Sequence, residues 1–250
     1  MQYEVYHANS AMDLSSAYRF ADASDLDFSS RYLGTRGFRQ FLAGKMIPLE
    51  RVIPSRRSLR SILASRRSSR AFRGSIQLNE LSTLLEEALG CTQIIQDSTQ
   101  LTHALRAWPS AGGLYPLDVY VAVQAVEQLP GGVYHYNPIR QCLEEMPCHD
   151  AAGFVGRAFF QQPIAIAASA ALIFVANFER TTAKYGERGY RLALLDAGHA
   201  AQNVLLVAEQ LGLGATALGG FSDEGISRDL GLDGVSEAPI HAVIVGKRDD

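Results

Sequence analysis

The most distinctive segment of the chain is Trp108-Pro-Ser-Ala-Gly-Gly-Leu-Tyr-Pro116. Two glycines and two prolines in nine residues exclude a helix interior or a central strand, because proline lacks an N–H group and fixes its own backbone. Immediately after this segment, residues 117–123 alternate as a strand does. We therefore predict a loop that leads directly into a strand.

Further strands and helices are expected on both sides of this loop. Strands are predicted for residues 133–138, for the apolar run 163–178, which is β-branched in its second half, and for 240–245. Helices are predicted for 59–66, 78–89, 190–211 and 222–230, with Ser58, Asn79 and Ser222 as N-caps and Gly90 as a stop. Residues 93–106 are interpreted as a polar connector. Because strands and helices are mixed rather than regularly alternating, an α+β fold is favoured.

Length and composition indicate a globular protein. The chain has 250 residues, of which 47% are hydrophobic and 20% are charged, which suffices for one large domain with a sizeable core. We divide it into an arm, residues 1–55, that packs on the domain or on a partner, and a domain, residues 56–250. The net charge of −3 argues against a protein dedicated to binding nucleic acid.

The sequence also bears on the cellular compartment. Three cysteines are too few for a disulfide framework, which favours a reducing compartment. The first residues lack the basic and apolar pattern of a signal peptide, and the longest apolar run, at about residues 163–175, is too short to span a bilayer. We expect a cytoplasmic protein without membrane contact.

Positive charge is concentrated in one segment. Eight arginines and no acid lie between Glu50 and Glu80. Neighbouring arginines repel one another, and a bound anion relieves the repulsion, because the planar guanidinium pairs bidentately with phosphate. The segment is therefore interpreted as an anion site, with nucleic acid or a phosphorylated cofactor as candidate ligands.

Several familiar site patterns are absent or out of context. Gly212-Leu-Gly-Ala-Thr-Ala217 has the letters of a dinucleotide fingerprint, but a predicted helix precedes it, so a helix C-cap followed by a tight turn is the better interpretation. The chain has no G-x-S-x-G elbow and its six histidines are scattered, so neither a serine triad nor a metal site is indicated. His135, between two tyrosines on a predicted strand, is interpreted as structural.

Lys184 and Tyr185 lie in a polar segment that follows a predicted buried strand. Lysine is rare in this chain, with three in total, and a loop after a strand is a common location for chemistry. Composition alone nevertheless favours a solvated lysine here, so the residues themselves leave both interpretations open.

Taken together, these segments resemble the FMN-dependent nitroreductase superfamily. Within it they resemble the azoline dehydrogenases of thiazole/oxazole-modified peptide biosynthesis, the microcin- and streptolysin-type dehydrogenase subunits. The motifs run in family order over roughly residues 1–248: Arg66-Arg-Ser-Ser-Arg-Ala-Phe72, Pro109-Ser-Ala-Gly-Gly-Leu-Tyr-Pro116, Gly132-Val-Tyr-His-Tyr-Asn-Pro138, Lys184-Tyr185 with Arg188-Gly-Tyr-Arg191, Asp196-Ala-Gly-His-Ala-Ala-Gln-Asn203 and Leu218-Gly-Gly-Phe221.

The resemblance implies a nitroreductase-like fold, a central and mostly antiparallel sheet flanked by helices, in an intertwined homodimer with two FMN molecules at the interface. The FMN contacts that it implies are Arg66, Arg67, Ser68, Arg70, Pro109, Ser110, Ala111, Gly112, Gly113, Leu218, Gly219, Gly220 and Lys247. The arginines and Ser68 would hold the phosphate and the polar edge of the ring, and residues 110–113 would approach from the partner subunit. Gly219 and Gly220 would place backbone N–H groups near N5 of the ring. Lys247 and Arg248 are the candidates for the further basic phosphate contacts of the family.

The resemblance leaves three functions open. The first is oxidation of a thiazoline or oxazoline to a thiazole or oxazole, in which Lys184 would take the proton from a weak carbon acid, Tyr185 would donate to the ring nitrogen or share the proton, and FMN would take the hydride and be reoxidised by O₂. The second is an NAD(P)H-dependent nitro or quinone reductase, which needs no such pair. The third is a non-catalytic flavoprotein subunit of a modification complex. The implied partners are cyclodehydratase subunits, or a carrier protein that delivers a peptide substrate.

Overall fold

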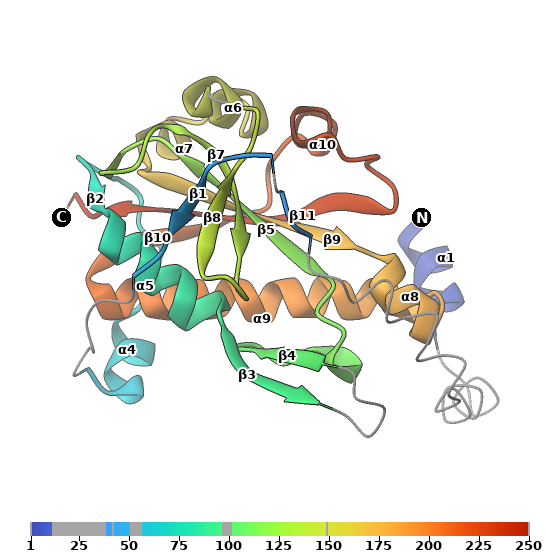
Figure 1. The fold of residues 1–250 in the computed structure, drawn as a ribbon. Coiled ribbons are helices and arrows are strands. Elements are labelled where there is room, and N and C mark those ends of the chain that lie inside the picture. The colour runs from blue at the N-terminus through green and yellow to red at the C-terminus, as the bar shows by residue number, and fades with distance from the viewer. Residues whose placement is uncertain are drawn as a thin grey trace.

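A seven-stranded sheet forms the centre of the molecule (Figure 1). The computed structural model describes residues 2–11, 39–41, 43–50, 57–96, 102–148 and 150–249. The strand order is β1-β8-β7-β5-β9-β11-β10, and every neighbouring pair is antiparallel. The strands are β1 (Met46–Pro48), β5 (Leu117–Val123), β7 (Gly132–Asn137), β8 (Cys142–Glu145), β9 (Ala170–Asn177), β10 (Leu213–Leu218) and β11 (Glu237–Lys247). The predicted α+β class with a mostly antiparallel sheet is confirmed.

Helices cover both faces of this sheet. The helices α5 (Leu78–Leu89) and α9 (Arg188–Leu211) lie on one face, and α6 (Ala151–Ala158), α7 (Pro163–Ala167) and α10 (Asp223–Leu230) lie on the other (Figure 1). The central strand β5 is buried at every position, because its residues alternate between two apolar cores. Val119 and Val121 belong to the core under α5 and α9, whereas Tyr120 and Ala122 belong to the core under α6 and α10.

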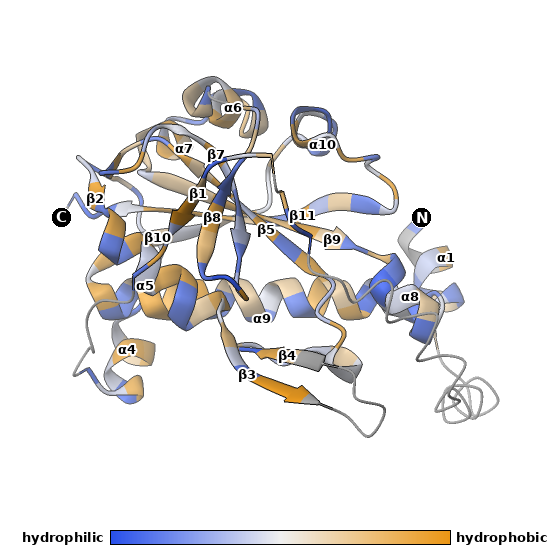
Figure 2. Ribbon diagram, in the orientation of Figure 1, coloured by the Kyte–Doolittle hydropathy of each residue, from blue (hydrophilic) through white to orange (hydrophobic). Residues whose placement is uncertain are grey.

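Helix α9 runs along the whole lower face of the sheet with its small residues inward. Ala193, Ala197 and Ala200 are buried, which lets the 24-residue helix lie close to the strands. The helix ends at Gly212, whose φ of 75° is left-handed, and β10 follows directly. Both the predicted long helix and the C-cap interpretation of Gly212 are therefore confirmed. Apolar positions recur along α9 in Figure 2.

The helix starts follow local hydrogen bonds. Helix α4 (Leu59–Ser65) begins after the predicted cap Ser58, whose hydroxyl accepts the N–H of Ser61 at 3.2 Å. Ser222 likewise caps α10 by accepting the N–H of Gly225 at 3.1 Å. The prediction of Asn79 as a cap is wrong: the cap lies two residues earlier, at Gln77, because the Glu80 carboxylate accepts the N–H of Gln77 at 2.8 Å.

Two further predicted segments have a different structure. Residues 93–106 are not a connector, because β3 (Cys91–Gln96) and β4 (Thr102–Arg106) form an antiparallel hairpin that projects past α9 (Figure 1). Residues 163–167 form α7, with Pro163 in its first turn, and only the second half of 163–178 is a strand. A short parallel pair, β2 (Ile76–Gln77) and β6 (Val126–Glu127), lies at the side of the sheet.

The described part of the first 55 residues, which were predicted to form an arm, contains a helix and a strand. Helix α1 (Gln2–Asn9) brings Tyr6 to an edge-to-face contact with Tyr190 of α9 at 5.1 Å between ring centroids. Strand β1 pairs with β8 at the edge of the sheet. The rest of the predicted arm, residues 1, 12–38, 42 and 51–55, lies outside the described residues. Among the helices of the described ranges, none has the length and apolar character needed to cross a bilayer.

Candidate functional site

Lys184 and Tyr185 do not lie in a loop. They form the last turn of the helix α8 (Glu179–Tyr185), which follows β9 and ends at Gly186 with a left-handed φ of 52°. Both side chains are half-buried, and the Lys184 ammonium lies 5.4 Å from the centroid of the Tyr185 ring. A methyl group on Gly112 would lie 2.6 Å from Tyr185 Oη and 3.1 Å from Lys184 Nζ. The structure therefore brings the tips of both side chains onto the loop at Gly112.

The backbone of the loop at residues 108–116 leaves space for these two side chains. Gly112 and Gly113 both have left-handed backbones, with φ of 61° and 63°, inside the short 3₁₀ turn Ala111–Gly113. The Ser110 hydroxyl accepts the N–H of Tyr115 at 2.9 Å and closes the loop, while Pro109 is exposed. A glycine is required at position 112 for two reasons: its φ is left-handed, and a side chain there would overlap Tyr185.

A buried carboxylate lies under this loop. Asp196, in the middle of α9, is 3% exposed, and its Oδ2 has no hydrogen-bond partner among the described residues. Burial raises the pKa of Asp196 to about 6, although the Ser110 hydroxyl, the Trp108 indole and the Ala111 N–H favour its charged form. The Trp108 N–H contributes through its proximity, since it does not reach hydrogen-bond geometry. Sequence reasoning assigned Asp196 no role, and the available signal was a lone acid in an otherwise apolar helix stretch.

The basic segment runs beside the edge strand β10. The Ser69 N–H donates to the Ala215 carbonyl at 3.2 Å, and the Thr216 hydroxyl donates to the Ser69 carbonyl at 2.6 Å. Arg66 is half-buried, whereas Arg67, Ser68 and Arg70 are exposed. Arg67 donates to the carbonyls of Ala64 and Arg66, and within the described ranges no acid pairs with these three arginines. Arg66, Arg67 and Arg70 are therefore cations without an acidic partner in the described structure.

A neighbouring buried acid on α9, Glu209, pairs with some of the other basic residues and leaves Lys247 exposed to solvent. Its carboxylate accepts hydrogen bonds from Ser65 at 2.5 Å, from Arg57 at 3.1 Å and from Arg248. Burial alone would raise the pKa of Glu209, but the Ser65 and Arg248 hydrogen bonds hold it below its usual value. Lys247 is exposed, and its carbonyl accepts the Arg73 N–H at 3.0 Å, which brings it next to the basic segment. Of the two predicted C-terminal residues, Arg248 thus neutralises Glu209 and Lys247 faces solvent.

The predicted glycine pair follows β10 directly. Leu218 is the last residue of that strand, and Gly219 and Gly220 after it are both exposed. Among the described residues, no atom lies within 4 Å of a methyl group built on Gly219, and the Gly220 carbonyl accepts the Gln162 side-chain amide at 3.3 Å. Another group can therefore approach this backbone closely.

Within one chain, the predicted site residues form two separate groups. Asp196 lies under the 108–116 loop, and Glu209 lies at the basic segment. The two acids are 13 positions apart on the same helix, and at a rise of 1.5 Å per residue this corresponds to about 20 Å along α9. Lys184, Tyr185 and Gly112 thus lie together at the end of α8, whereas the basic segment continues from α4, and Figure 1 shows α8 and α4 near opposite ends of α9.

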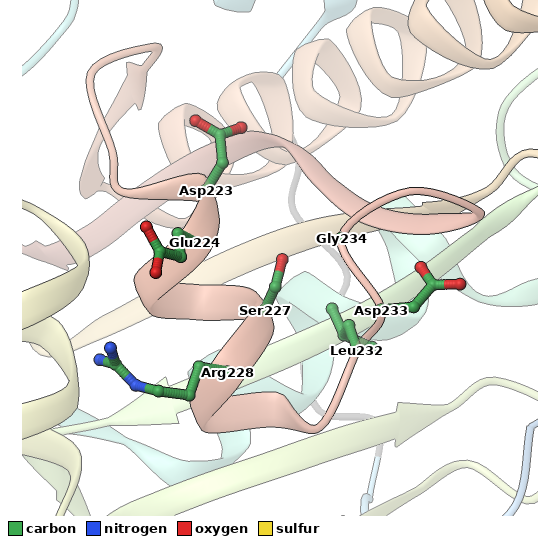
Figure 3. A pocket seen from close by; sticks show the side chains of 7 residues that line it. All are labelled: Asp223, Glu224, Ser227, Arg228, Leu232, Asp233 and Gly234. Carbon is green, nitrogen blue, oxygen red and sulfur yellow. The ribbon is translucent and has the colours of Figure 1, made fainter.

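One cavity elsewhere in the described structure contains none of these residues. A cavity of about 460 Å³ beside α10 is lined by Asp223, Glu224, Ser227, Arg228, Leu232, Asp233 and Gly234. Its acidic side chains point in different directions (Figure 3). In the described part of the chain, no three His, Cys, Asp or Glu residues are grouped as a metal site requires.

Comparison with known proteins identifies the family of this chain. Residues 63–247 match the model of the nitroreductase family. The chain belongs to this family. A nitroreductase-family protein of Methanocaldococcus jannaschii is 36% identical over 191 residues, which cover 76% of this chain and 91% of that protein. The microcin B17-processing protein McbC of Escherichia coli is 32% identical over 150 residues, or 58% of this chain and 55% of McbC. The trifolitoxin-processing protein TfxB of Rhizobium leguminosarum is 27% identical, and the chain spans about half the length of both processing proteins.

Solved structures show the same fold. A nitroreductase of Anabaena variabilis superimposes with a TM-score of 0.77 at 26% identity, covering 99% of this chain and 46% of that chain. A chain of the E. coli microcin synthetase McbBCD, solved with truncated pro-MccB17 bound, superimposes with a TM-score of 0.62 at 24% identity, covering 100% of this chain and 98% of that chain. The resemblance inferred from the motifs, to the nitroreductases and to their microcin-processing branch, is confirmed. Proteins of this family are generally flavin-dependent oxidoreductases.

Proposed function

We propose that this protein is an FMN-dependent dehydrogenase that oxidises thiazoline or oxazoline rings in a peptide to thiazole or oxazole. The observation that carries the proposal is the contact of Lys184 and Tyr185 with Gly112 in the loop at residues 108–116. A reductase that only passes electrons from flavin to a nitro group or a quinone needs no such base. The similarity to McbC and TfxB, both described as peptide-processing proteins, supports the same reaction class.

The residues of this chain suit FMN. Arg66, Arg67 and Arg70 have no acidic partner in the described ranges, and the guanidinium fork matches a phosphate group. We propose that Ser68 and Lys247 complete the phosphate contacts, because both are exposed beside these arginines. Leu218, Gly219 and Gly220 would hold the flavin ring through their open backbone.

We further propose that the working unit is an intertwined homodimer. The two groups of site residues lie about 20 Å apart along α9 in one chain, so the second group at each flavin would come from a partner copy. Residues 109–113, Lys184 and Tyr185 of one subunit would then face the basic segment of the other. Leu194 and Leu195 on α9 are 40% and 57% exposed, and a partner would cover them.

In the proposed reaction, the azoline ring loses a proton and a hydride to two different acceptors. The Lys184 amine takes the proton from the azoline carbon next to the ring nitrogen, and the Tyr185 hydroxyl donates to that nitrogen, which makes the carbon more acidic. When FMN is bound, it supplies the acceptor for the hydride that leaves the other ring carbon. Gly112 keeps both side chains close, because it presents no side chain of its own to them.

The natural substrate is proposed to be a peptide presented by partner subunits. McbBCD is a multi-subunit complex with a pro-peptide bound, and one of its chains shares this fold. We infer that cyclodehydratase subunits, or a carrier protein, deliver the azoline-containing peptide to the present protein.

The test uses the purified protein loaded with FMN and a synthetic thiazoline peptide under air. We expect the peptide to lose two hydrogens by mass spectrometry and to gain thiazole absorbance. Reduction of a nitroaromatic by NAD(P)H with no loss of hydrogen from the peptide would instead favour the second enzyme function. No reaction of either kind by the FMN-loaded protein would favour the non-catalytic subunit.

A further inference from the structure

An ion pair lies at the start of the helix that ends with Lys184 and Tyr185. Arg180, in the first half of α8, donates from Nη2 to Asp118 Oδ2 at 3.1 Å and from Nη1 to Asp118 Oδ1 at 3.3 Å. The side chains of Arg180 and Asp118 are 8% and 5% exposed, so the pair is buried and bidentate. Asp118 belongs to β5, 62 positions away along the chain. The pair therefore joins α8 to the central sheet.

The same guanidinium also reaches the loop at residues 108–116. Arg180 Nη1 donates to the Tyr115 carbonyl at 3.4 Å, and the Tyr115 N–H donates to the Ser110 hydroxyl at 2.9 Å. Tyr115 has a φ of 45°, a left-handed backbone that non-glycine residues rarely adopt unless their surroundings enforce it. Arg180 thus fixes one end of the loop whose middle, Gly112, meets Lys184 and Tyr185.

Helix α8 depends on such contacts for its position. It has seven residues, which is too short for stability in isolation. On one side it is pressed against α9, where a methyl group on Gly189 would lie 2.4 Å from the Thr182 nitrogen. Near its start the Asp118–Arg180 pair anchors it, and Lys184 follows Arg180 by one turn on the same face.

We propose that the Asp118–Arg180 ion pair positions the catalytic residues Lys184 and Tyr185. It holds α8 and the loop at residues 108–116 in a fixed arrangement, so that both catalytic side chains meet the substrate. This inference rests on the proposed function. Buried ion pairs add little net stability compared with apolar residues of similar volume, so a bidentate pair here supplies geometry rather than stability. Arg180 and Asp118 are positioning residues, since their contacts run through α8 and Tyr115.

The experiment compares matched variants of the FMN-loaded protein. The double variant Asp118→Leu/Arg180→Met removes both charges of the pair together, and Arg180→Lys keeps the charge but loses the fork. The control is Arg157→Met/Asp229→Leu, which removes another Arg–Asp pair, between α6 and α10, with Nη2–Oδ2 at 2.9 Å. Each protein is assayed for azole formation, for quinone reduction and for amide hydrogen exchange of α8.

We expect the double variant to lose roughly 10- to 100-fold in kcat for azole formation, the scale of a displacement of about 1 Å. Its KM, FMN content and quinone reduction should stay within about twofold, and α8 amides should exchange faster while those of α10 do not. Arg180→Lys should show the same pattern to a smaller extent, and it replaces the double variant if that protein does not fold. The control should leave the ratio of azole formation to quinone reduction unchanged.

Three results would overturn the inference. If a folded double variant forms azole with an unchanged kcat, the pair has no positioning role, whereas the proposed function would stand. If the α8 amides of the double variant exchange as slowly as those of the wild type, the pair does not anchor α8. This test does not depend on activity, so it also holds if the wild type forms no azole and the proposed function fails. A parallel loss of both activities together with flavin would make the pair a general stabilising element.

Discussion

Replacing Gly112 by alanine probes the contact between the loop and the catalytic pair. A non-glycine residue at the φ of 61° found here costs about 1–2 kcal/mol. The added methyl would in addition lie 2.6 Å from Tyr185 Oη. Gly113→Ala is the matched control, because Gly113 has a φ of 63° and no atom of the described residues lies within 4 Å of its added methyl. We expect Gly112→Ala to be less stable than this control by about 1–3 kcal/mol, the scale of overpacking.

A double-mutant cycle tests whether this difference in stability comes from the Tyr185 hydroxyl oxygen. With Tyr185→Phe, the nearest atom of that ring to the Gly112→Ala methyl would be Cζ at 3.5 Å, which is ordinary contact. Tyr185→Phe should therefore recover most of the overpacking cost, giving a coupling free energy of about 1–3 kcal/mol between the two sites.

The assay is urea unfolding of the wild type, both single variants, the double variant and Gly113→Ala. Equal stability of the two glycine variants, together with a coupling below about 0.5 kcal/mol, would show that the Tyr185 hydroxyl does not lie on the loop.

Three further predictions concern charge and assembly. Burial raises the native pKa of Asp196 to about 6 from an ordinary 3.8, so the native state binds this proton more tightly than the unfolded state and gains stability as pH falls between these values. Asp196→Asn should remove roughly 3 kcal/mol of this pH dependence, measured by urea unfolding at about pH 8 and pH 4. A pH dependence equal to that of the wild type would refute the burial argument. Arg66→Ala should weaken FMN binding by about 1.5–3 kcal/mol in a fluorescence titration, whereas Arg157→Ala should not, and equal affinities would remove Arg66 from the site. Light scattering at micromolar concentration should give twice the 27.2 kDa chain mass, and a particle of the chain mass would contradict the dimer.

Much of the fold could be read from local patterns. The long helix α9, the strand β5 and the caps Ser58 and Ser222 each depend on periodicity or on a hydrogen bond within a few residues. Gln77 escaped prediction as a cap because asparagine is the commoner cap type, while the decisive contact is that of Glu80 three positions on.

The parts that could not be predicted depend on distant contacts. Helix α8 is short and polar, and Arg180 anchors it through Asp118, 62 positions away. Asp196 belongs to one of the family motifs, but its position under Ser110 follows only from the packing of α9 against the loop. The hairpin β3–β4 contains exposed apolar residues such as Ile94, which is 59% exposed and interrupts the alternation expected of a strand (Figure 2).

The roles of the site residues were available from the motifs only as a resemblance. The structure adds that Lys184 and Tyr185 meet Gly112 within one chain and that Arg248 is occupied by Glu209. Neither contact has a local signal in the sequence, because each joins segments more than 30 positions apart.

The most direct measurement of the central claim compares two activities of one variant, Lys184→Ala, with those of the wild type. Both proteins are loaded with FMN, and azole formation from a thiazoline peptide is measured beside reduction of a quinone. The account predicts that Lys184→Ala keeps its flavin, its oligomeric state and its quinone reduction, but loses azole formation by at least about 100-fold, the usual contribution of a general base. Normal azole formation by this variant would contradict the assignment of Lys184 as the base.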